Sequence, residues 1–293
     1  MSGEMRQSTV GFVGLGQMGK PMARNLVSKG FTVTVCGHTR KEPVEELKTL
    51  GALVVASPRE VAEASDVIIV AVRDAAQTEE AIRGTGGCRQ GEGIWHGIRK
   101  GATLIICSTV EPAYCQQLAG EGEEKGVDVL DAPISGGPPG ARSGTLTFMV
   151  GGRKEVFERC YPVFQAMAGK IVHVGASGMG QVVKIVNNFM TIANFFAASE
   201  AINLGLNAGL SLRSILEVTR GSSGNSWIIE RWDQMMSLKE NYEKRGESGT
   251  IGLFAKDLGL ALALSDRLGV AVPLGRFVSG LDRSQLFPGK YPK

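Results

Sequence analysis

Residues 9–36 read TVGFVGLGQMGKPMARNLVSKGFTVTVC, and this stretch decides the fold. A short apolar run typical of a strand, at residues 9–13, is followed at once by a GxGxxG pattern. Apolar side chains then recur at helical spacing over residues 20–29, and residues 31–36 form a second strand-like run. A strand, a glycine loop, a helix and a second strand are the context in which a GxGxxG pattern binds a dinucleotide.

The glycines of this motif have separate physical tasks. Gly14 permits the tight turn, Gly16 lets the backbone approach a pyrophosphate, and Gly19 lets the helix pack closely on the strand. The helix N-terminus offers N–H groups and the positive end of its dipole to the phosphates. The alternative interpretation is a glycine-rich turn without a ligand. We predict a cofactor site formed by the whole motif, Gly14, Leu15, Gly16, Gln17, Met18 and Gly19.

The end of the second strand bears on the choice of cofactor. Enzymes that use NAD usually place Asp or Glu there, where it holds the ribose 2′-hydroxyl. This chain reads CGHTRK at residues 36–41 and has no carboxylate before Glu42. Because arginine suits a phosphate geometrically, the sequence favours NADP, with NAD as the alternative. We assign His38, Thr39 and Arg40 to the cofactor site, against the alternative that Arg40 only begins a solvated helix.

Strand and helix patterns continue to alternate as far as residue 174. Further strands are predicted at residues 53–55, 66–72, 103–107, 127–131, 145–150 and 171–174. Helices are predicted at residues 58–64, with Ser57 as N-cap, and at 76–83 and 113–125, with an irregular loop at 84–97. This alternation predicts an α/β fold with a doubly wound, Rossmann-type parallel sheet, whose ligands bind at the carboxyl ends of the strands. Val72, Thr109 and residues 133–139 fall at such ends.

The second half of the chain has a different pattern. Residues 180–209 predict one long helix that is apolar all round, which is typical of a buried helix. Helices at residues 212–219, 227–236 and 255–268 follow, without strand signals. We therefore predict a Rossmann-type domain over residues 1–173 and an all-helical C-terminal domain over residues 174–293, joined by the long helix. The active site is expected in the cleft between the two domains.

Lys184 lies among valines and isoleucines near the start of the long helix. A charged lysine is costly to bury there, so loss of its proton is favoured and Lys184 becomes a candidate general acid or base. Asn188, four residues further on, lies on the same face of the helix. The alternative is a lysine whose stem is buried while its ammonium group reaches solvent.

Four motifs occur together and in order. They are GFVGLGQMG at residues 11–19, DAPISGG at 131–137 running on to ARSGTLTFMVGG at 141–152, GQVVKIVNN at 180–188, and FAKDL at 254–258. By these motifs the chain resembles the β-hydroxyacid dehydrogenases, the 3-hydroxyisobutyrate dehydrogenase family, over residues 9–280.

This resemblance implies roles in catalysis and substrate binding. It implies that Lys184 is the catalytic lysine and that Asn188 is its partner. It also implies that Ser135, Gly136 and Gly137 bind the carboxylate of the substrate. The reaction it implies is reversible hydride transfer between NADP(H) and a small 3-hydroxy carboxylic acid, or the corresponding semialdehyde.

The same resemblance implies roles around the cofactor. It implies that Thr109 touches the nicotinamide end and that Lys256 lies near both nicotinamide and substrate. Asp257 is implied to orient the local structure. Residues 222–227 resemble a loop at the border of the substrate pocket.

Composition limits the class of protein. The chain has 293 residues, enough for two domains, and its 43% hydrophobic and 21% charged residues are ordinary for a globular protein. A net charge of +3 without a dense Lys/Arg block argues against a nucleic-acid partner. No continuous apolar run is long enough to predict a membrane span. The five cysteines are scattered and lack CxxC spacing, so we expect buried thiols in a reducing cytoplasm and no metal site.

Several alternatives stay open. The substrate could be L-serine, another β-hydroxyacid, or a semialdehyde or glyoxylate-type carbonyl that the enzyme reduces. A catalytically silent dinucleotide sensor would be expected to lose Lys184, and imine reductases generally carry another residue there. A decarboxylating enzyme of the 6-phosphogluconate type would have a longer helical domain. Residues 84–97 and the chain after Pro273 depart from the family pattern, and we expect a homodimer or homotetramer.

Overall fold

The computed structural model describes residues 8–38, 40–85, 91–244 and 249–281. The chain divides into two compact units, Met1–Lys184 and Ile185–Lys293, which are described separately below. The division falls inside the long helix α8 (Met179–Asn207), whereas the sequence places the domain boundary ahead of that helix, at residues 173/174.

The N-terminal unit is built on a nine-stranded sheet in the order β3-β2-β1-β4-β5-β6-β8-β7, with β9 paired to β8. Its first six strands are β1 (Val10–Val13), β2 (Val33–Cys36), β3 (Leu53–Val55), β4 (Val67–Val70), β5 (Thr103–Ile106) and β6 (Asp128–Asp131). All neighbouring pairs among these six are parallel, which confirms the predicted Rossmann-type sheet. The strand order reverses between β1 and β4, and ligands of such sheets bind at that point.

The remaining strands make the sheet mixed. β8 (Leu146–Gly151) runs antiparallel to β6 and to the short β7 (Ile134–Ser135). β9 (Ala168–Gly175) pairs with β8 in parallel. The parallel arrangement that the sequence predicts is therefore confirmed for β1 to β6, and β8 departs from it by running antiparallel to β6 and β7.

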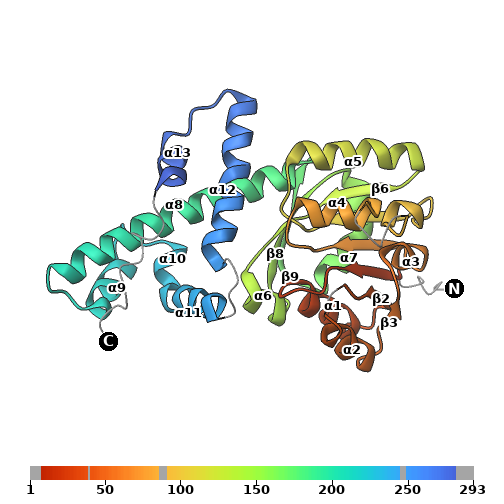
Figure 1. Ribbon diagram of the computed structural model, residues 1–293, viewed down its shortest axis with the longest axis horizontal. Helices are drawn as coiled ribbons and strands as arrows, with labels where there is room; N and C mark the ends of the chain where they lie inside the picture. The colour runs from red at the N-terminus through yellow and green to blue at the C-terminus, as the bar shows by residue number, and fades with distance from the viewer. Residues whose placement is uncertain (1–7, 39, 86–90, 245–248, 282–293) are drawn as a thin grey trace. The chain divides into compact units, whose positions relative to one another are not determined.

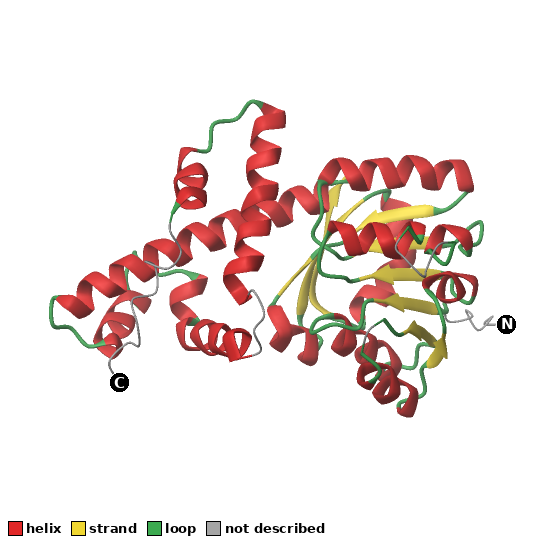
Figure 2. Ribbon diagram, viewed as in Figure 1, coloured by secondary structure: helices red, strands yellow, loops and turns green. Residues whose placement is uncertain are grey.

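Two hydrophobic cores cover the two faces of the sheet (Figure 2). One face packs against α1 (Gly19–Ser28), α2 (Glu42–Thr49), α6 (Gly137–Ser143) and α7 (Lys154–Gln165). The other packs against α3 (Pro58–Glu63), α4 (Ala75–Arg83) and α5 (Pro112–Lys125). Strands β1, β2, β4 and β5 are buried along their whole length, which explains their continuous apolar sequences.

The local predictions hold in part. Ser57 caps α3 as expected, its hydroxyl accepting a hydrogen bond of 3.3 Å from the Glu60 N–H. Helices α2, α6 and α7 were not predicted. The four described cysteines are buried, as expected, and form no disulfide bond with one another, and Cys88 lies outside the described residues.

The segment 84–97, predicted as an irregular loop, ends in a short 3-10 turn, η2 (Ile94–His96). Ile94 is fully buried, and the Trp95 indole N–H donates to Glu121 Oε2 at 3.0 Å. Glu121 also pairs with Arg83 Nη2 at 2.7 Å. The end of the segment is therefore anchored to α4 and α5, while residues 86–90 lie outside the described residues.

The C-terminal unit is helical throughout its described residues, as predicted (Figure 1). After α8 come α9 (Leu212–Arg220), α10 (Trp227–Glu230), α11 (Trp232–Lys244), α12 (Gly249–Leu268) and α13 (Pro273–Gly280). Its core centres on the fully buried Trp232, which stacks on Phe195 of α8 with ring centroids 6.2 Å apart. The single helix predicted at residues 227–236 is interrupted at Arg231, so that prediction is wrong.

Helix α8 differs from expectation in its burial. Val186, Met190 and Leu204 are 51%, 53% and 74% exposed in the single chain, so α8 is only partly buried by its own chain. At 29 residues and a mean hydropathy of 1.2, α8 is the one helix of the described part long and apolar enough to cross a membrane. Core helices of soluble proteins reach the same length and hydropathy, so these two properties alone do not indicate a membrane span.

Candidate active site

The glycine loop has the geometry that its sequence predicts. Gly14 has a φ of +102°, and a Cβ atom on it would lie 2.5 Å from the Ala71 carbonyl oxygen. A Cβ on Gly19 would lie 1.8 Å from the Gly14 carbonyl oxygen, so only glycine lets α1 approach the loop. Around Gly16, by contrast, nothing lies within 4 Å of the Cβ position. The loop therefore leaves open space where a pyrophosphate would approach, and the residues present fit a dinucleotide.

The other residues of the loop frame this space. Leu15 and Met18 pack partly against the core, and Gln17 is half-buried. No side chain caps the start of α1, and its first turn holds no acidic residue. Its N–H groups thus face the loop in the arrangement that favours phosphate.

At the end of β2 the predicted cofactor residues are exposed. His38 Nε2 lies 3.8 Å from Glu80 Oε1, and Arg40 is exposed. Glu42, the first carboxylate after the strand, lies 3.7 Å from Lys20 Nζ. Thr39 lies outside the described residues.

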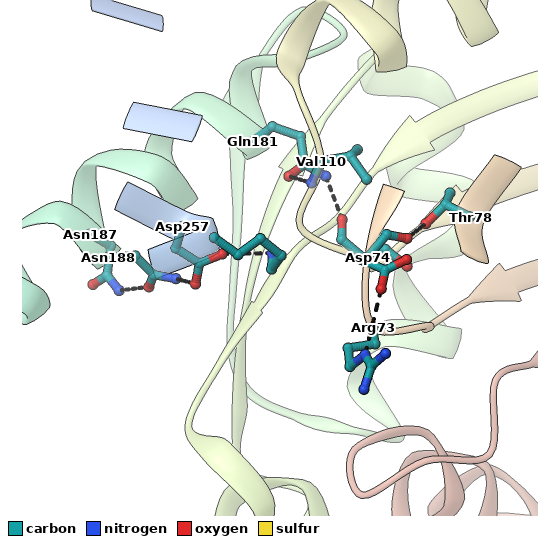
Figure 3. A network of polar contacts seen from close by, with 10 residues as sticks. Arg73, Asp74, Thr78, Val110, Gln181, Asn187, Asn188 and Asp257 are labelled. Carbon is teal, nitrogen blue, oxygen red and sulfur yellow. Dashed lines mark hydrogen bonds and ion pairs between the residues drawn. The ribbon is translucent and has the colours of Figure 1, made fainter. Parts of the chain in front are cut away.

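The ends of β4 and β5 are joined by one hydroxyl group. The Val72 N–H donates to Ser108 Oγ at 3.0 Å, and Ser108 is almost fully buried. Val72 and Thr109, the two cofactor residues predicted here, are both half-buried and lie beside this contact. The following Val110 N–H donates to Gln181 Oε1 at 3.2 Å (Figure 3).

The predicted substrate-binding residues form a turn between β7 and α6. Ser135 ends the strand and Gly137 begins the helix. Gly136 and Gly137 have φ angles of +128° and +61°, so this turn requires glycine at two successive positions. Successive N–H groups in such a turn can converge on an anion.

Asp131, at the end of β6, holds the first turn of α8. Its carboxylate is fully buried, and Oδ1 accepts from the Gly178 N–H at 2.7 Å while Oδ2 accepts from the Gln181 N–H at 2.9 Å. Burial raises the pKa of this carboxyl above its usual value, although the N–H groups of Gly178 and Gln181 act in the opposite direction. Lys184 follows Gln181 by three residues and is half-buried, so its backbone position is set by this contact.

In the C-terminal unit, Asn188 and Lys256 are brought together by Asp257. The Asn188 amide donates to Asp257 Oδ2 at 2.7 Å (Figure 3). Lys256 Nζ lies 2.7 Å from Asp257 Oδ1. Asn188 Oδ1 also accepts from the Asn187 amide at 3.0 Å. These contacts are what an orienting role for Asp257 requires.

The predicted residues thus form two groups joined by α8. The N-terminal unit holds the glycine loop, Val72, Thr109, the Ser135–Gly137 turn and Lys184, and the C-terminal unit holds Asn188, Lys256 and Asp257. Sequence reasoning missed Asp131, Gln181 and Ser108. The signal that could have found the first two is a carboxylate and an amide within otherwise apolar runs, since such groups need polar partners when buried.

Comparisons with known proteins show which family the chain belongs to. Residues 9–175 match a family described as the NAD binding domain of 6-phosphogluconate dehydrogenase, and residues 178–285 match one described as NAD-binding of NADP-dependent 3-hydroxyisobutyrate dehydrogenase. The NAD-dependent L-serine dehydrogenase of Pseudomonas aeruginosa is 35% identical over 96% of this chain and 93% of that protein. The 2-hydroxy-3-oxopropionate reductase of Escherichia coli is 38% identical over 90% and 86%.

A solved structure extends the similarity to three dimensions. The 3-hydroxyisobutyrate dehydrogenase of Mycobacterium tuberculosis, in a structure with L-serine, superposes with a TM-score of 0.78 and 30% identity, covering 94% of this chain and 92% of that one. Fold, site and relatives together define an NAD(P)-dependent oxidoreductase that acts on hydroxyacids. Within that class, the chain belongs to the β-hydroxyacid dehydrogenase family.

The close approach of α8 to the sheet can be tested at Gly180. A Cβ there would lie 2.4 Å from the Met149 carbonyl oxygen and 2.7 Å from the Asp131 carboxylate. We expect Gly180→Ala to lower the free energy of unfolding by about 1–3 kcal/mol, measured by urea denaturation. Gly120, inside α5 with nothing within 4 Å of its Cβ position, is the matched control, and Gly120→Ala should raise stability by about 0.5–1 kcal/mol. Equal changes in the free energy of unfolding for the two substitutions would contradict a close approach of α8 to the sheet at Gly180.

Proposed function

We propose that this enzyme transfers hydride reversibly between NADP(H) and a small carboxylic acid with a hydroxyl on its third carbon, 3-hydroxyisobutyrate or a close analogue. The relatives are named for 3-hydroxyisobutyrate, L-serine and 2-hydroxy-3-oxopropionate, all small carboxylates oxidised or reduced at that carbon. The observation that supports the proposal is that Lys184 lies three residues beyond Gln181, whose N–H donates to the buried Asp131 carboxylate at the end of β6.

The substrate carboxylate is assigned to Ser135 and to the N–H groups of Gly136 and Gly137. The two positive φ angles favour an anion at this turn. A fixed carboxylate leaves the hydroxyl at the far end of a short molecule, so its position relative to Lys184 is also fixed. Such positioning converts an encounter into a defined geometry and supplies much of the rate.

Proton transfer is assigned to Lys184. In the oxidation direction its neutral amine accepts the proton of the substrate hydroxyl, and in reduction its ammonium returns that proton to the oxygen. Asn188, one turn further along α8 and held by Asp257, orients the hydroxyl and the lysine. Lys256, which pairs with the same carboxylate, is assigned to contact with substrate and cofactor.

The cofactor site is assigned to Gly14–Gly19, His38, Thr39, Arg40, Val72, Thr109 and Lys256. When bound, the nicotinamide dinucleotide supplies the two-electron step of the reaction. We infer a preference for NADP because cations at residues 40 and 41 follow β2, with no carboxylate before Glu42. L-serine, or a semialdehyde or glyoxylate-type carbonyl, is the second candidate substrate class, favoured by the L-serine and 2-hydroxy-3-oxopropionate enzymes among the relatives.

Lys184→Ala tests the assignment of the proton-transfer residue. We expect the variant to lose several orders of magnitude in turnover, since Lys184 is the group assigned to the hydroxyl proton, while NADPH binding is retained. The assay follows reduced cofactor during a screen of 3-hydroxyisobutyrate, L-serine and related semialdehydes with both cofactors. Lys170→Ala, at an exposed lysine of β9, is the matched control. Near-normal turnover in Lys184→Ala would refute the assignment, and no turnover by the unmodified protein would favour a dinucleotide sensor.

Arg40→Ala tests the cofactor preference. Loss of a charge-assisted contact to the 2′-phosphate should lower kcat/KM for NADP by about 10- to 100-fold and leave that for NAD nearly unchanged. Arg59→Ala is the control, because Arg59 is also exposed but pairs with Glu63 on α3. A similar loss with both cofactors, or no loss with either, would argue against phosphate recognition by Arg40.

We also propose that the protein is a homodimer or homotetramer that covers the exposed side chains of α8. Val186, Met190 and Leu204 are each more than half exposed, and surfaces of this kind are normally covered by another protein surface. Val186→Lys should therefore lower the molecular mass measured by sedimentation equilibrium. Val54→Lys, on the edge strand β3 where Val54 is 40% exposed, should leave it unchanged. A monomeric unmodified protein would contradict the proposal.

A further inference from the structure

Gln181 has an unusually complete set of contacts for a side chain that the reaction does not use. It is fully buried, and its amide pairs with the two residues on either side of Thr109. Nε2 donates to the Ser108 carbonyl oxygen at 2.9 Å, and Oε1 accepts from the Val110 N–H at 3.2 Å (Figure 3). The side chain thus pairs with the backbone at the end of β5 as a neighbouring strand would.

The backbone of Gln181 is held from a second direction. Its N–H donates to Asp131 Oδ2 at 2.9 Å, at the end of β6. The residue before it, Gly180, has no room for a side chain against the Met149 carbonyl oxygen. The first turn of α8 therefore cannot rotate or slide without breaking buried hydrogen bonds, and unpaired buried groups are costly.

The contacts continue from Gln181 to the next strand. Ser108, whose carbonyl accepts from Gln181, also accepts at its hydroxyl from the Val72 N–H at 3.0 Å. One chain of hydrogen bonds thus joins the ends of β4 and β5 to α8. Along α8 in the C-terminal direction, Lys184 lies three residues beyond Gln181, about 4.5 Å along the axis of a helix that is rigid over this length.

We propose that Gln181 is a positioning residue for hydride transfer, fixing the distance between the cofactor-contacting edge at Val72 and Thr109 and the proton-transfer group of Lys184. The inference rests on the proposed function, in which Thr109 contacts the nicotinamide end and Lys184 handles the hydroxyl proton. The inference adds that one amide side chain, that of Gln181, fixes the position of Lys184 relative to Thr109. A purely stabilising role for Gln181 is the competing explanation.

The experiment distinguishes a role of Gln181 in aligning the reacting groups from a role in stabilising the fold. Gln181→Met keeps the length of the side chain and removes both amide contacts. We expect kcat to fall about 100-fold, with the KM of the hydroxyacid and the Kd of NADPH changed less than about threefold, because the carboxylate and phosphate sites are untouched. The primary deuterium isotope effect on kcat should rise, since a misaligned hydride transfer becomes rate-limiting. Gln181→Asn, which keeps the amide but shortens its reach, should lose about tenfold and serves if the Met variant does not fold.

A control that lowers stability away from the site completes the design. Ser57→Ala removes the N-cap of α3, away from the site, and should lower Tm without changing kcat or the isotope effect. If the folded Gln181 variants keep kcat and the isotope effect of the unmodified enzyme while Tm falls, Gln181 is only stabilising and the inference is overturned. Measuring Lys184→Ala in parallel distinguishes a failure of the inference about Gln181 from a failure of the proposed function. An inactive Lys184→Ala beside active Gln181 variants refutes the inference alone, whereas an active Lys184→Ala refutes the proposed function and the inference with it.

Discussion

The buried carboxylate of Asp131 is the contact on which the site depends. Removing a carboxylate from water is costly, and the cost is visible in the raised pKa of this group. It is offset by two N–H groups at the start of α8, where the helix dipole also favours negative charge. A Cβ on Gly151, at the end of β8, would lie 2.6 Å from Asp131 Oδ1. The absence of a side chain at residue 151 therefore leaves room for the Asp131 carboxylate. Because Asp131 ends β6, the sheet itself determines where α8 begins.

Several properties of the enzyme follow from that fixed starting point. The positions of Gln181 and Lys184 on α8 follow from helical geometry, and the Gln181 side chain joins the helix to the backbone at the end of β5. Asn188 lies a turn further on and is held by Asp257, which also pairs with Lys256. A single helix thus carries Lys184 and Asn188, the two residues to which we assign proton transfer and its orientation. The chemistry of this family needs such precision, because hydride and proton must leave neighbouring atoms of one small substrate.

The sequence predicted those parts of the fold that depend on local pattern. The glycine motif was found from the spacing of its glycines, and strands β1 to β6 were found because each is a short apolar run with a clear boundary. Helix α6 was missed because Pro138 and Pro139 suggest a turn, although proline is tolerated in the first turn of a helix. The reversed direction of β8 depends on pairing with distant strands, which no local pattern contains. Asp131 and Gln181 were missed for a related reason, since their partners lie 47 to 73 residues away.

The central claim is that Lys184 handles the hydroxyl proton of a small substrate whose carboxylate is held at Ser135–Gly137. A crystal structure of the enzyme with NADP⁺ and 3-hydroxyisobutyrate, or the hydroxyacid that the screen identifies, tests it most directly. The account predicts Lys184 Nζ at about 2.6–3.2 Å from the substrate hydroxyl and the carboxylate on the N–H groups of Gly136 and Gly137. A hydroxyl whose hydrogen-bond partner is another acid or base, with Lys184 out of reach, would contradict it.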